Sequence, residues 1–140
     1  MLLAKQERWA TGRIFLIMTI NSNYLNADTD KNKSICMYPF KHSYIGSRYE
    51  RKLCCISDDI DELEKTSLDE YWNSDKIKQV RKDMLEGKPI KECQKCYEFE
   101  KRGIPSLRQE ATINGLGIKK EDILDDGTMV VGPDYFDHRT

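Results

Sequence analysis

The segment Cys93-Gln94-Lys95-Cys96 holds two cysteines separated by two residues. This spacing lets both thiolates point at one metal centre, while the backbone amides between them turn towards the sulfurs. A soft cation needs about four such ligands, so two more must come from elsewhere in the chain. The remaining cysteines, Cys36 and the adjacent Cys54 and Cys55, can supply them.

The stretch from Cys36 to Ile56 predicts how these distant ligands meet. Two short β-prone runs flank a turn at Gly46, which is the pattern of a hairpin. Pro39 suits the outer edge or the entry of such a hairpin. Because the turn folds the chain back, we expect Cys36 to approach Cys54 and Cys55 at one end of the hairpin.

After the hairpin, the sequence shows the start and stop signals of short helices. Ser67 and Glu70 have the spacing of a capping box, and Ser74 can cap a second helix. Gly87 followed by Pro89 ends that second helix. The other predicted elements are helices at 97–102 and after Ser106, and a strand at 128–131.

Length and composition limit the fold and its partners. The 140 residues suffice for one small domain. Hydrophobic residues make up 39% of the chain and charged residues 34%, so the core is small. The net charge of -1 argues against a general nucleic-acid or membrane-surface binder. We therefore predict a small α+β domain, stabilised by metal, with a β-hairpin, several short helices and flexible termini.

The use of cysteine indicates a reducing compartment. There are five cysteines, an odd number, and two of them are adjacent, which fits a disulfide framework poorly. The apolar run at 14–20 is too short to span a bilayer, and no signal-peptide cleavage site follows it. These features predict a cytoplasmic protein.

Several other interpretations of the cysteines stay open. Cys54 and Cys55 could belong to an ordinary buried strand, and the pair at 93 and 96 could be a redox-active dithiol. His42 could replace one thiolate as a ligand. The main alternative is structural zinc held by the same four thiolates, which would make the domain a protein-interaction module with no redox role.

The ordered set of motifs also resembles a known family. It comprises Cys36-Met37-Tyr38-Pro39-Phe40, Leu53-Cys54-Cys55, Tyr71-Trp72-Asn73-Ser74, the segment 80–87, and Cys93-Gln94-Lys95-Cys96-Tyr97. These segments are similar to the twitch or SPASM-type auxiliary cluster region of radical SAM proteins. The resemblance covers residues 35–110. It implies an auxiliary [4Fe-4S] cluster ligated by Cys36, Cys54, Cys93 and Cys96, with Cys55 as the alternative to Cys54.

The chain lacks the Cys-x-x-x-Cys-x-x-Cys motif that binds S-adenosylmethionine in that family. The resemblance therefore implies that the chain is no catalyst alone and meets S-adenosylmethionine only through a radical SAM barrel, in cis or in trans. We expect an N-terminal arm at 1–34, disordered or extended, the cluster domain at 35–110, and a linker at 111–140 towards a missing or separately encoded barrel. The expected roles are electron transfer, substrate positioning or structure, with a peptide or protein as a candidate substrate.

Overall fold

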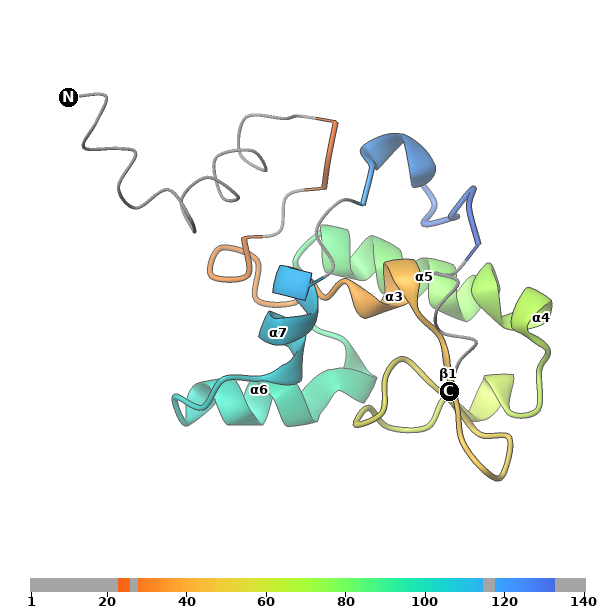
Figure 1. Cartoon of the computed structure of the whole chain (residues 1–140), viewed down its shortest axis with the longest axis horizontal. Coiled ribbons are helices and arrows are strands. Elements are labelled where there is room, and N and C mark those ends of the chain that lie inside the picture. Colours follow the sequence, from red (N-terminus) through yellow and green to blue (C-terminus); the bar gives the residue numbers. More distant parts are fainter. Residues whose placement is uncertain (1–22, 26–27, 115–117, 133–140) are drawn as a thin grey trace.

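The computed structural model describes residues 23–25, 28–114 and 118–132. Short helices surround one small hairpin (Figure 1). The elements are α3 (Tyr38–Lys41), β1 (Tyr44–Ile45), β2 (Arg51–Lys52), η1 (Asp61–Leu63), α4 (Leu68–Trp72), α5 (Asp75–Leu85), η2 (Lys91–Cys93), α6 (Gln94–Lys101), α7 (Leu107–Asn114) and η3 (Lys120–Asp122). This confirms the predicted α+β class with a hairpin and several short helices. The termini predicted to be flexible lie largely outside the described residues.

The hairpin is shorter than the sequence suggests. β1 and β2 are antiparallel, with Tyr44 opposite Lys52. The prediction that residues 36–40 belong to a β-prone run is wrong, because Tyr38–Lys41 form α3. Pro39 stands in the first turn of α3, where its missing N–H removes no intrahelical bond.

The chain also leaves the hairpin early after β2. Residues 53–57 form a turn, where a continuing strand was expected. The hydroxyl of Ser57 accepts hydrogen bonds from the backbone N–H groups of Leu53 (3.0 Å) and Cys54 (3.3 Å). A serine side chain that binds nearby backbone groups in this way competes with strand pairing, so the ladder ends.

The predicted helix signals operate as expected. Ser67 and Glu70 form the complete capping box of α4, with bonds of 2.8 and 3.1 Å. The hydroxyl of Ser74 caps α5. Gly87 ends α5 with a φ of 78°, a left-handed conformation that glycine adopts without steric cost. Local sequence therefore determines where α4 and α5 begin and where α5 ends.

The strand predicted at 128–131 is reduced to one isolated bridge between Ile123 and Met129. Side chains satisfy the backbone here instead of a neighbouring strand. The side chain of Asn73 binds both the N–H and the carbonyl oxygen of Met129, at 2.9 Å each. The indole N–H of Trp72 donates to the carbonyl oxygen of Val131 at 2.7 Å. These bonds hold the segment against α4 without a sheet.

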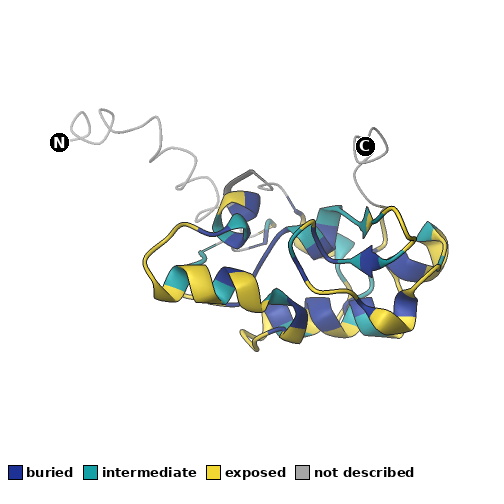
Figure 2. Cartoon of the chain, turned by 90° about the horizontal axis from the view of Figure 1, so that it is seen from below, coloured by how far each residue is buried: buried dark blue, intermediate teal, exposed yellow. Residues whose placement is uncertain are grey.

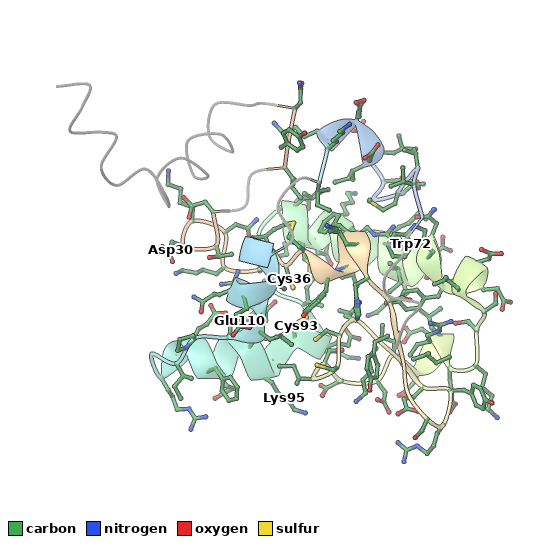
Figure 3. The ribbon with its side chains drawn as sticks, in the orientation of Figure 1. Asp30, Cys36, Trp72, Cys93, Lys95 and Glu110 are labelled. Carbon is green, nitrogen blue, oxygen red and sulfur yellow. The ribbon has the colours of Figure 1, made fainter. Side chains whose placement is uncertain are left out.

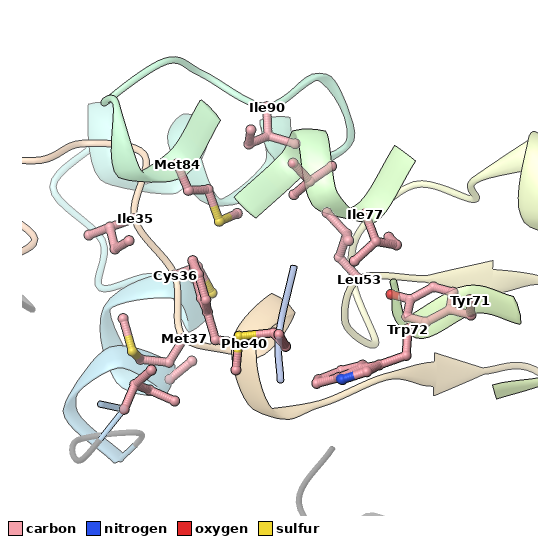
Figure 4. Packing of buried hydrophobic residues seen from close by; sticks show 14 of the residues in the cluster. Ile35, Cys36, Met37, Phe40, Leu53, Tyr71, Trp72, Ile77, Met84 and Ile90 are labelled. Atoms are coloured by element: carbon pink, nitrogen blue, oxygen red, sulfur yellow. The ribbon is translucent and has the colours of Figure 1, made fainter. Parts of the chain in front are cut away.

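The hydrophobic core lies between α3, α5 and the turn after β2. The inward side of α5 contributes Ile77, Val80 and Met84, all nearly inaccessible to solvent. Figure 4 shows Cys36 among the side chains of this apolar cluster. The helices carry buried and exposed residues on different sides (Figure 2). None of the described helices is long and apolar enough to cross a bilayer.

Part of the segment ahead of Cys36 packs against this core. Asn32 donates from its side-chain amide to the carbonyl oxygen of Met84 at 2.8 Å. Its side-chain oxygen accepts the backbone N–H groups of Ser34 and Ile35 at 2.9 Å each. Asn32 thus helps to fix the approach of the chain to Cys36.

Candidate metal centre

Four cysteines from three distant segments line one cavity. Cys36 precedes α3, Cys54 lies in the turn after β2, and Cys93 and Cys96 stand at the start of α6. Figure 3 shows Cys36 and Cys93 at the centre of the molecule, near α3, α7 and the start of α6. Cys55 is exposed and is not among the residues that line the cavity.

The local backbone orients Cys36 and Cys54. The backbone N–H of Tyr38 donates to the Cys36 thiol. The N–H groups of Ile56 and Ser57 donate to the Cys54 thiol, because the turn at 53–57 directs them towards that sulfur. Such N–H groups also stabilise sulfur that carries negative charge.

Cys93 and Cys96 are placed by the start of α6. Cys93 ends η2 and Cys96 lies three residues later in the first turn of α6, so both side chains project from the same side. The hydroxyl of Tyr97 accepts the N–H of Ile90 at 3.0 Å, and the side chain of Gln94 donates to the Ile90 carbonyl at 3.2 Å. These two bonds anchor the cysteine pair to the loop that precedes it.

Burial makes these thiols hard to ionise. It raises the pKa of Cys36 to about 12 and also raises the pKa values of Cys54 and Cys93. Neighbouring thiols add to this effect, because several negative sulfurs would repel one another: Cys54 and Cys96 raise the pKa of Cys36, and both raise that of Cys93. These four thiols would be held as thiolates if a metal centre were bound, because metals ligate the deprotonated sulfur.

The donor set suits an iron–sulfur cluster, and structural zinc uses the same four thiolates. Four thiols in apolar surroundings that include Pro39, Leu53 and Met84 are the ligands and the setting that such clusters use. The cavity holds about 20 Å³, room for about one water molecule, so a cluster needs the cysteine side chains to turn outward. Among the described residues, no three His, Cys, Asp or Glu side chains are grouped closely enough to hold one metal ion.

Comparison with known proteins agrees with this chemistry. Residues 36–97 match the family model of SPASM, described as an iron-sulfur cluster-binding domain. This stretch is a SPASM-type region. The searches of curated proteins and of solved structures found no match. The SPASM match includes all four cavity cysteines and stops before α7.

Arg108, outside the SPASM match, also lines the cavity and was missed by the sequence reasoning. The sequence Ser106-Leu107-Arg108-Gln109 predicted a cap for α7, and Ser106 and Gln109 do make reciprocal bonds of 3.0 and 3.2 Å. Nothing in that pattern shows that the arginine between them is buried. The only signal in the sequence was a basic residue in the first turn of the predicted helix.

The other basic and imidazole candidates lie less centrally. Lys95 lines the cavity but is exposed, and in Figure 3 it lies below α6. His42 follows α3 and contacts the ring of Tyr38 at a centroid distance of 4.8 Å. It is not a lining residue of the SPASM cavity. The cavity therefore presents sulfur ligands from cysteine, with Arg108 as its buried cation.

Proposed function

We propose that the SPASM region holds one [4Fe-4S] cluster through Cys36, Cys54, Cys93 and Cys96. The observation that carries this proposal is that four thiols from three distant segments line one buried cavity. The exposure of Cys55 favours Cys54 as the second ligand. When bound, the cluster accepts and donates single electrons.

The role follows from the number of protein ligands. With four thiolates, every iron has a protein ligand, and none is left open to bind S-adenosylmethionine or substrate. We infer an auxiliary module of a radical SAM protein that transfers electrons or supports the structure, beside a barrel in cis or in trans. Positioning of a peptide or protein substrate is compatible with the same site. A reducing cytoplasm suits five cysteines that are all free thiols.

Zinc is the alternative occupant, because four cysteine thiolates are also a structural zinc donor set. A tetrahedral zinc site needs four ligand atoms within roughly 2.3 Å of one point. The match of residues 36–97 to an iron-sulfur cluster-binding domain favours the cluster over zinc.

Anaerobic reconstitution tests the proposal. Metal-free protein is incubated with ferrous iron and sulfide under reducing conditions, and a parallel sample receives zinc. We expect broad visible absorption that bleaches on reduction with dithionite, with iron and acid-labile sulfide in equal amounts. A colourless chain that retains stoichiometric zinc instead would refute the cluster and support the interaction module.

A further inference from the structure

Arg108 is a fully buried cation with an unusually complete set of partners. Its side chain is 2% exposed. Its Nε and Nη2 donate to the Glu100 carboxylate at 2.8 and 2.6 Å. Its Nη1 donates to the carbonyl oxygens of Asn32 and Ile35 at 3.1 and 3.0 Å, and Nη2 reaches the carbonyl of Thr29 at 3.4 Å. All three nitrogens of the planar guanidinium therefore donate hydrogen bonds.

These bonds join the two segments that carry the cavity cysteines. Ile35 directly precedes Cys36, and Glu100 lies one helical turn after Cys96 in α6. Arg108 therefore clamps the approach to Cys36 onto the helix that bears Cys96. The hydroxyl of Ser106 supports the clamp by donating to the same carboxylate at 2.5 Å.

The charge of Arg108 also acts on the cavity. The guanidinium lines the same cavity wall as Cys36. Because Arg108 is buried, water and salt screen its charge much less than that of the exposed Lys95, which lines the same cavity. The Glu100 carboxylate partly cancels the positive charge.

Given the cluster proposed above, we propose that Arg108 tunes its reduction potential, with Glu100 opposing it. Reduction adds one electron, taken from an external one-electron donor, and neither makes nor breaks a covalent bond. The added negative charge is stabilised by the guanidinium at the cavity wall and destabilised by the carboxylate behind it. Arg108 is thus a positioning residue that also sets the potential of the cluster.

Opposite shifts in two variants test this role. The midpoint potential of the anaerobically reconstituted chain is measured by redox titration in the wild type, Arg108→Gln and Glu100→Gln. We expect Arg108→Gln to disfavour reduction at least about tenfold, which is 59 mV for a one-electron couple. Glu100→Gln should shift the potential the other way. Arg108→Lys should restore most of the wild-type value, because it keeps the charge.

Glu98→Gln is the matched control, because Glu98 lies on the same helix but is exposed. The midpoint potential of the cluster in this variant should stay close to the wild-type value. A merely structural clamp would loosen in both variants and admit water, which shifts both potentials in the same direction. If Arg108→Gln fails to assemble a cluster, Glu100→Gln decides: a positive shift supports the role, and no shift or a negative one overturns it. A wild-type chain that binds no cluster overturns the proposed function itself.

Discussion

Serine in place of Cys54 and of Cys55 gives a matched pair of variants at neighbouring positions. Cys54 is 8% exposed and lines the cavity, whereas Cys55 is exposed and points elsewhere. In the proposed cluster, Cys54→Ser removes one of four ligands and leaves one iron without a thiolate. Cys55→Ser leaves the ligand set intact. The two changes are chemically identical, so a difference between them reports position alone.

The burial of each side chain sets the expected magnitude. In metal-free protein, Cys54→Ser puts a hydroxyl into an apolar cavity and should cost about 1–3 kcal/mol of unfolding free energy. Cys55→Ser is a surface change and should stay within about 0.5 kcal/mol. After reconstitution, cluster content in Cys54→Ser should fall at least about tenfold, since loss of a contact that only supports a ligand already costs roughly 10–100-fold in metal affinity.

Iron and acid-labile sulfide per chain, measured after gel filtration under anaerobic conditions, give the cluster content. Urea unfolding of the metal-free variants gives the stability. Equal loss of cluster in both variants would show that the substitutions disturb the turn at 53–57, not one particular ligand. Loss in Cys55→Ser alone would refute the assignment of Cys54, because the exposed thiol would then have to be the ligand.

Other predictions concern the frame around the site. Arg81→Met should cost at least about 3 kcal/mol in urea unfolding, because the buried guanidinium donates to three backbone carbonyls and a side-chain oxygen that lose their partner. The metal-free chain should lose stability between pH 9 and 12, because burial raises the pKa of Cys36 to about 12 in the fold and ionisation of this thiol therefore favours the unfolded chain. Alkaline titration followed by circular dichroism measures this loss, which the loaded chain should not show. Gly127→Ala should lower the melting temperature clearly more than Gly87→Ala, because a Cβ at 127 would collide with the carbonyl of Lys78, whereas the space around Gly87 is open.

The helices and their ends could be predicted because their signals are local. The serine at 67 and its glutamate partner satisfy each other within one turn, and the glycine at 87 ends its helix without help from distant residues. The meeting of distant cysteines was also predictable in outline. The turn at 46 pairs β1 with β2, and this brings the segments before and after the hairpin to one end.

The remaining features depend on side-chain contacts over long sequence distances. Arg81 binds the carbonyl oxygens of Pro39 and Gly127, which lie 42 and 46 residues away. That contact helps to hold residues 38–41 as a helix beside α5, and no local sequence pattern predicts it. The same holds for Arg108, whose partners Asn32 and Ile35 are more than 70 residues distant. A buried arginine looks like a surface arginine in the sequence until the fold is known.

The most direct test is a crystal structure of the reconstituted chain, with diffraction recorded on both sides of the iron absorption edge. Convergence of four thiolates predicts one compact anomalous peak of several irons, in contact with the sulfurs of Cys36, Cys54, Cys93 and Cys96. An iron site held by other residues, or density for a single zinc ion among these four sulfurs, would contradict the central claim.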